Sequence, residues 1–219
     1  TYLTQELVDL VDSKYRALPQ RESRGVTGCS MGGGGALPLA LKYPPVYSVA
    51  APVAATYDAA QDPALAQAAE FFQGEPADLD AAARLDWPIQ SWMALAAAAA
   101  SNPDKPPFFL DMPFTLVDGQ GQVVQEVVDR IVSTDAIHDL ERYINQPERL
   151  RAIMLYHGAW DTFVPEELAQ AFSARLTEQG IEHAYVEVNA LHCSQWAPDL
   201  YTPVVQFMSD NLVAEELAP

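Results

Sequence analysis

Apolar and polar positions follow two periods along this chain, and the two periods alternate near both of its ends. At the start, leucines and valines recur at helical spacing as far as Pro19, which predicts a helix with Thr4 as its N-cap. Short apolar runs bounded by turn residues predict strands at 24–27, 46–53, 153–156 and 184–188. Helical spacing predicts further helices at 31–42, 166–179 and 204–212. Strands that alternate with helices predict an α/β fold, with a mostly parallel sheet and helices on both of its faces.

This regular succession is interrupted between residues 56 and 150, a stretch that is rich in alanine and proline. Within 114–128, the dipeptide Asp118-Gly119 favours a β-hairpin. Further helices are expected at 62–72, 88–100, 135–143 and 147–150. We interpret 56–150 as a lid-like insertion over the carboxyl edge of the sheet, within a single domain that spans residues 1–219.

The composition narrows the possible partners of the protein. The 219 residues, 49% of them hydrophobic and 19% charged, suit a globular chain with one sizeable core. The 30 acidic residues outnumber the 12 basic ones, and the net charge of −18 argues against binding to nucleic acid or to an anionic membrane surface. No apolar stretch approaches the roughly 20 residues that a membrane span needs.

A glycine-rich turn joins the first expected strand to the next helix. It contains the pentapeptide Gly28-Cys29-Ser30-Met31-Gly32, in which a sharp strand-to-helix turn projects the serine outward. Glycines two residues before and after the serine keep neighbouring atoms from blocking such a turn. The turn presents Ser30 as a candidate nucleophile. By itself, the pentapeptide fits a glycine-rich turn with an incidental serine equally well.

Two further residues lie where the partners of a nucleophilic serine belong. A serine needs a histidine that accepts its proton, and the histidine needs a carboxylate that holds its tautomer. In a parallel α/β sheet, such groups follow the carboxyl ends of strands. Asp161 and His192 follow the last two expected strands in this way. The order Ser30, Asp161, His192 is that of α/β-hydrolases, so we predict a catalytic triad.

The three remaining histidines are assigned to other roles. His157 lies near a strand end and is expected to line the substrate pocket or to support a loop. His138 is expected on a solvated helix, and His183 at the opposite end of a strand. No spacing of histidines, cysteines and carboxylates resembles a metal site.

Several stretches resemble the esterase D-like family of α/β-hydrolases, which includes S-formylglutathione hydrolases, feruloyl and acetylxylan esterases and mycolyltransferases. The likeness is strongest over residues 2–44 and returns at 156–165 and 191–192. It implies an α/β-hydrolase fold and a serine carboxylic-ester hydrolase that works through an acyl-enzyme and needs no cofactor.

The sequence departs from this family at its start. Family members place several strands and an oxyanion-hole loop before the helix that opens this sequence. The N–H of Met31 supplies one oxyanion donor, and the second would come from such a loop. We therefore expect that the N-terminal strands are missing and that the chain is the C-terminal part of a longer enzyme. A second chain that supplies the rest and a degenerate protein are the alternatives. The residues of strand 24–27 by themselves predict a buried strand, and without its neighbours this strand becomes an exposed apolar edge.

The only two cysteines lie beside the candidate triad. Cys29 directly precedes Ser30, and Cys193 directly follows His192. If the serine and histidine meet, the cysteines approach the Cα separation of about 4.4–6.8 Å that a disulfide needs. The alternative is two buried thiols that act as small apolar residues. A Cys-Ser, Asp and His-Cys arrangement also resembles tannases and fungal feruloyl esterases. This resemblance implies a disulfide between the serine and histidine loops. Such a bond would imply an oxidising compartment, and we therefore expect a secreted or periplasmic location.

The expected substrate is a small-molecule or polysaccharide-linked ester with a feruloyl, other aromatic or short acyl group. A peptidase or acyltransferase on the same triad is a second hypothesis, and a non-catalytic binding domain that keeps the fold is a third. Candidate pocket residues are His157 and five aromatic residues that could belong to the core instead, namely Trp160, Trp196, Phe108, Phe109 and Phe114.

Overall fold

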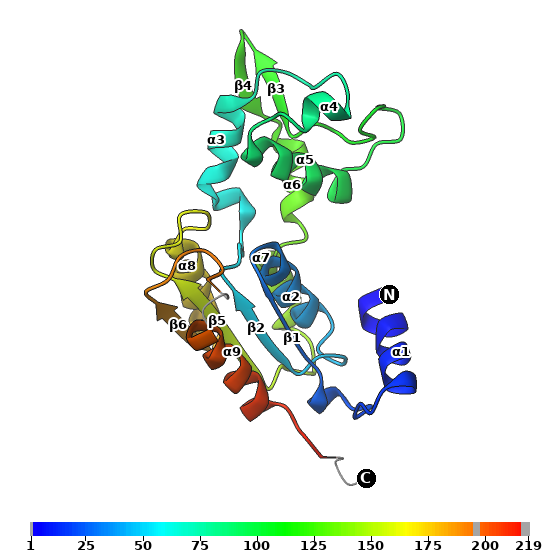
Figure 1. The fold of residues 1–219 in the computed structure, drawn as a ribbon, viewed down its shortest axis with the longest axis vertical. Helices are drawn as coiled ribbons and strands as arrows, with labels where there is room; N and C mark the ends of the chain where they lie inside the picture. The colour runs from blue at the N-terminus through cyan, green and yellow to red at the C-terminus, as the bar shows by residue number, and fades with distance from the viewer. Residues whose placement is uncertain (1, 195–197, 216–219) are drawn as a thin grey trace. The chain divides into compact units, whose positions relative to one another are not determined.

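The computed structural model describes residues 2–194 and 198–215. These residues form two compact units (Figure 1). The first unit combines residues 1–57 with residues 139–219, and the second consists of residues 58–138. Within the described residues, every helix is too short or too polar to cross a membrane.

The first unit is built on a four-stranded sheet in which every pair of neighbouring strands is parallel. The strand order is β1-β2-β5-β6. The bounds of these strands are β1 Gly25–Cys29, β2 Val49–Val53, β5 Ala152–Gly158 and β6 Ala184–Val188. Because all four strands run the same way, their carboxyl ends meet at one edge of the sheet, where the loops that follow them lie close together. The expected parallel sheet is confirmed.

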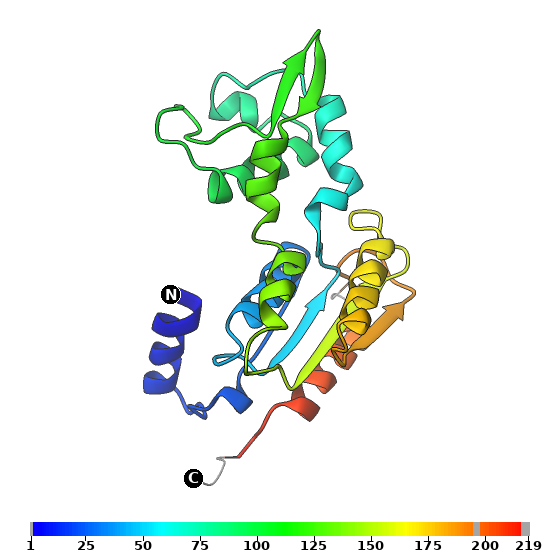
Figure 2. The same cartoon turned by 180° about the vertical axis from the view of Figure 1, so that it is seen from behind.

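Helices cover both faces of this sheet. α9 lies in front of the sheet in Figure 1 and α8 lies in front of it in Figure 2, which views the molecule from behind. Val204 of α9 packs with Ala51, Val53, Met154 and Tyr156 of β2 and β5 in one apolar cluster. The helices and helical turns of the first unit are η1 Tyr2–Glu6, α1 Leu7–Lys14, η2 Arg21–Ser23, α2 Met31–Lys42, α8 Glu166–Glu178 and α9 Pro198–Asn211, and α7 Ala136–Tyr143 lies at the boundary of the two units in the sequence.

β1 is an edge strand, and its burial corrects the sequence-based interpretation. The sequence predicted a buried strand, but β1 is only partly buried and Thr27 is exposed. Among the described residues, β1 pairs with β2 alone. Beside it lies a cavity of about 580 Å³, lined mainly by apolar residues of α1 and of the segment that follows α9, together with Gly25 of β1. The expected exposed apolar edge is therefore present.

Two expected helix features near the ends of these elements are wrong. Thr4 lies inside the helical turn Tyr2–Glu6, which continues into α1, and so it does not form an N-cap. Residues 147–150 are not helical. The Arg149 guanidinium donates to the backbone carbonyl oxygens of Tyr143, Ile144 and Gln146, at and beyond the end of α7. The segment is thus bonded to α7 instead of forming a turn of its own.

The second unit combines helices with a short hairpin. Its elements are η3 Ala59–Gln61, α3 Pro63–Phe71, α4 Leu79–Ala82, α5 Trp87–Ala99, β3 Phe114–Val117, β4 Gln120–Val123 and α6 Gln125–Val132. Asp118 and Gly119 form the two-residue hairpin loop with φ of 52° and 76°, as a type I′ turn requires. The hairpin is shorter than predicted, because the chain becomes helical at Gln125. Phe114 lies in the core of this unit, and the centroid of its ring is 5.7 Å from the centroid of the Phe72 ring.

Candidate active site

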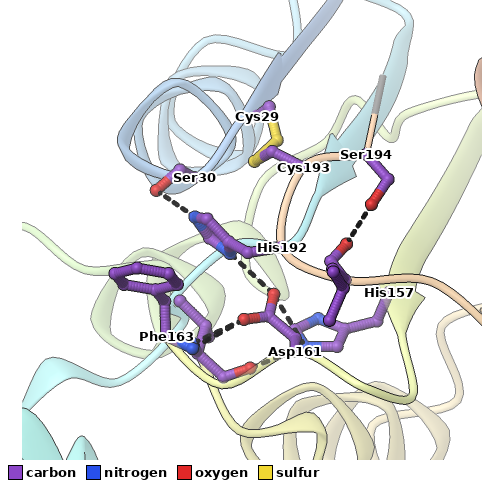
Figure 3. A network of polar contacts seen from close by, with 10 residues as sticks. Cys29, Ser30, His157, Asp161, Phe163, His192, Cys193 and Ser194 are labelled. Carbon is purple, nitrogen blue, oxygen red and sulfur yellow. Dashed lines mark hydrogen bonds and ion pairs between the residues drawn. A yellow bond between two sulfur atoms is a disulfide. The ribbon is translucent and has the colours of Figure 1, made fainter. Parts of the chain in front are cut away.

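Ser30 occupies the sharp turn between β1 and α2. Its φ of 55° and ψ of −121° are unusual for a residue that is not glycine. Such a conformation costs of the order of 1–3 kcal/mol and persists only where the surroundings enforce it. The backbone N–H of Ser30 donates to the carbonyl oxygen of Val53 at 3.0 Å, which ties the turn to the neighbouring strand. The serine side chain thereby projects away from the strand (Figure 3).

The glycines around Ser30 do not all serve the same purpose. A Cβ atom at Gly28 would lie 2.5 Å from the carbonyl oxygen of Gly32, so the turn closes only with glycine there. A Cβ atom at Gly33 would lie 2.9 Å from the carbonyl oxygen of Gly28. A Cβ atom at Gly32, by contrast, would meet no heavy atom within 4 Å. Close approach therefore explains Gly28 and Gly33, and the sequence-based explanation for Gly32 is wrong.

The structure brings the three predicted triad residues together in one hydrogen-bonded line. His192 Nε2 lies 2.9 Å from Ser30 Oγ, and His192 Nδ1 lies 2.7 Å from Asp161 Oδ2 (Figure 3). The residues come from the loops that follow β1, β5 and β6, at the carboxyl edge of the sheet. Since a carboxylate only accepts, Nδ1 carries the proton and Nε2 presents its lone pair to the serine hydroxyl.

The second carboxylate oxygen of Asp161 is bound by its own loop. Oδ1 accepts hydrogen bonds from the backbone N–H groups of Phe163 and Val164, each at 2.9 Å. The side chain of Asp161 is fully buried, whereas that of His192 is 18% exposed. Oδ2 therefore faces His192 while Oδ1 is anchored, which fixes the plane of the carboxylate.

A disulfide joins Cys29 to Cys193. Their Cα atoms are 5.9 Å apart, within the usual range for such a bond. The two cysteines pack against the apolar cluster between the sheet and α9. Because each cysteine adjoins a triad residue, the bond ties the turn that carries Ser30 to the loop that carries His192 (Figure 3).

The start of α2 offers a donor for a developing negative charge. Met31 is the first residue of this helix, and its backbone N–H makes no hydrogen bond within the described residues. Free N–H groups at a helix start carry partial positive charge and favour anions. The position of Met31 therefore fits the predicted oxyanion donor.

The candidate pocket residues lie in different surroundings. His157 is fully buried behind Asp161, whereas the side chain of Trp160 is more than half exposed. Trp196 lies outside the described residues. The sequence analysis missed Phe163, whose ring lies 5.2 Å from the His192 ring between centroids. Its position two residues after Asp161 was the available signal.

Comparisons with known proteins agree with this arrangement. A family model described as "Putative esterase" matches residues 1–202. A search of curated proteins finds no match.

Solved structures with a similar fold include FphF, a fluorophosphonate-binding serine hydrolase of Staphylococcus aureus, at 14% sequence identity and a TM-score of 0.59. The alignment covers 94% of this chain and 62% of FphF. An S-formylglutathione hydrolase from Agrobacterium tumefaciens has 16% identity and a TM-score of 0.54, with 97% of this chain and 57% of the other covered. A ferulic acid esterase has 13% identity and a TM-score of 0.53, with 97% and 60% covered. The chain thus spans about 60% of the length of these proteins, and it belongs to the esterase family with the α/β-hydrolase fold that the sequence predicted.

Proposed function

We propose that this chain carries the triad of a serine esterase, which hydrolyses carboxylic esters through an acyl-enzyme. The observation that carries the proposal is the hydrogen-bonded line from Ser30 through His192 to Asp161. The strained backbone of Ser30 supports it, because such strain is typical of a nucleophile held at a strand-to-helix turn.

The geometry supports the following sequence of steps. Ser30 Oγ attacks the ester carbonyl carbon while His192 Nε2 takes the hydroxyl proton. Asp161 stabilises the imidazolium that forms, and the N–H of Met31 donates to the oxyanion. Collapse of the tetrahedral intermediate breaks the bond to the alcohol, which leaves with the proton from His192. Water then attacks the acyl-enzyme, again with His192 as base, and releases the acid and free Ser30.

An efficient oxyanion hole needs a second donor. Removal of one such donor lowers turnover by roughly 10²–10³-fold in a serine hydrolase. We propose that a segment before residue 1 or a second chain supplies it. The exposed edge of β1 supports this proposal, because a further strand can pair there.

Exposed apolar residues lie close in the sequence to every member of the triad. They are Met31 beside Ser30, Leu191 beside His192, and Trp160 and Phe163 on either side of Asp161, each more than half exposed. Such surroundings favour esters with an apolar or aromatic acyl group, such as a feruloyl ester, whether free or linked to a polysaccharide. The disulfide supports a secreted or periplasmic location, because such bonds persist in oxidising compartments.

The test compares the full-length protein with its Ser30→Ala variant on p-nitrophenyl acetate, p-nitrophenyl butyrate and methyl ferulate. We expect the variant to lose at least about 10³-fold in kcat/KM and to lose labelling by a fluorophosphonate probe. Ser13→Ala, which changes an exposed serine of α1, is the matched control and should behave as the parent. Retained turnover or labelling in Ser30→Ala would refute the assignment. Cleavage of a p-nitroanilide in preference to all three esters would favour the peptidase alternative.

A further inference from the structure

His157 is a buried polar residue that the steps above do not use. It lies near the end of β5, and its side chain is completely shielded from solvent. A buried polar group destabilises the fold unless it is hydrogen-bonded. His157 Nε2 lies 2.9 Å from the carbonyl oxygen of Val164, whereas Nδ1 has no partner among the described residues.

These contacts indicate which ring nitrogen carries a proton. A carbonyl oxygen only accepts hydrogen bonds, so Nε2 carries the proton and donates it. A second proton on Nδ1 would be a buried donor without an acceptor in the described structure. The contacts therefore fit a neutral ring with the Nε2–H tautomer.

Val164 connects this imidazole to the triad. Its carbonyl oxygen accepts from His157, and its N–H donates to Asp161 Oδ1 at 2.9 Å. The backbone carbonyl and N–H of Val164 are thus both engaged, the carbonyl by His157 of β5 and the N–H by the carboxylate of Asp161. His157 Nε2 is 3.8 Å from Asp161 Oδ2, which is too far for a direct hydrogen bond. Among the described residues, the hydrogen-bonded connection from His157 to Asp161 therefore runs through Val164.

We propose that His157 is a positioning residue, which holds Val164 so that Asp161 keeps Oδ1 on the loop and Oδ2 on His192. The proposal rests on the proposed triad, and it extends that triad by a fourth side chain that never touches the substrate. Loss of the Nε2–H donor releases the carbonyl of Val164 and lets the carboxylate rotate. A rotated carboxylate no longer aligns His192 with Ser30.

The test uses two variants of nearly equal size in the full-length protein. His157→Gln places an amide N–H₂ donor close to the position of Nε2, whereas His157→Met has a similar length and no donor. We expect His157→Met to lower kcat by about 10–100-fold with little change in KM, because misplacement of a catalytic group affects the reaction step. His157→Gln keeps a donor to the carbonyl of Val164 and should therefore stay within about fivefold of the parent. The unfolding midpoint of each variant shows whether it is folded.

If His157 only fills the core and does not position Asp161, the two variants give a different result. In that case the two variants lower kcat equally, or neither lowers it while the unfolding midpoint falls, and either outcome overturns the proposal.

A second measurement needs no variant and no activity. Nitrogen-15 NMR of the histidine side chains in the parent protein should show His157 as a neutral Nε2–H tautomer whose proton exchanges slowly. A proton on Nδ1 alone would overturn the proposal, even for variants that fail to fold. If the parent neither reacts with fluorophosphonate nor hydrolyses esters, the proposed function fails, whereas the tautomer still decides whether His157 holds the loop.

Discussion

Two parts of the triad are held in place by different kinds of bond. The disulfide joins the neighbours of Ser30 and His192 covalently. Asp161, by contrast, is held by backbone N–H groups of its own loop. A covalent bond keeps its partners together when nearby loops open, whereas a single hydrogen bond contributes only about 0.5–1.5 kcal/mol. The spacing of serine and histidine is therefore the robust part of the site, and the orientation of the aspartate is the sensitive part.

Because the two parts are held differently, substitutions in them should have different effects. A change at the hydrogen-bonded aspartate should appear mainly in the rate of reaction, because its hydrogen bonds within the described residues go only to its own loop and to His192. Loss of the covalent bond should appear mainly in stability, because the bond restricts the unfolded chain.

The largest effect is expected from Asp161→Asn. The amide cannot accept from both His192 and the loop as the carboxylate does, and it favours the wrong tautomer of His192. We expect kcat to fall by about 10⁴-fold with the unfolding midpoint nearly unchanged. Asp210→Asn on α9, outside the site, is the matched control. A loss of less than tenfold would show that the aspartate does not orient the histidine.

The next largest effect is expected from removal of the disulfide in a Cys29→Ala, Cys193→Ala double variant. The bond spans 164 residues, for which the chain-entropy model gives a stabilisation on the order of 5 kcal/mol. Urea unfolding of the variant, and of the parent with and without reductant, measures this loss. We expect a much smaller loss of kcat than in Asp161→Asn, because β1 and β6 still position their loops. Free thiols in the unreduced parent, or unchanged stability in the variant, would contradict this prediction.

The robust part of the site was also the part that the sequence predicted best. The turn at Ser30 has a local signature, and each cysteine adjoins a triad residue in the sequence, so their proximity follows from that of Ser30 and His192. Strands such as β6 and helices such as α2 were also predicted at their observed bounds, because their periodicity is local.

The orientation of Asp161, the sensitive part of the site, depends on contacts that the spacing of apolar residues does not predict. The bond from His157 to Val164 exists only because the chain between them folds back after β5, which no spacing in the sequence reveals. The same reason explains the error at 147–150, where the Arg149 side chain binds carbonyl groups at and beyond the end of α7. The burial of β1 could not be predicted from its own residues, because it depends on how many strands flank β1 in the sheet; the comparison with longer family members predicted the exposed edge.

The smallest effect is expected at the turn that carries Ser30. This experiment tests whether the disulfide alone holds the turn in place. Gly28→Ala forces a Cβ atom against the Gly32 backbone and should lower the free energy of unfolding by about 1–3 kcal/mol, even with the disulfide formed. Gly32→Ala is the matched control, because its Cβ meets open space at the start of α2. We expect it to be neutral or to stabilise the helix by up to about 1 kcal/mol. Urea unfolding of both oxidised variants measures the difference. Equal free energies would show that the disulfide fixes the turn without help from its packing, whereas the expected difference means that close backbone contact and the covalent bond hold Ser30 together.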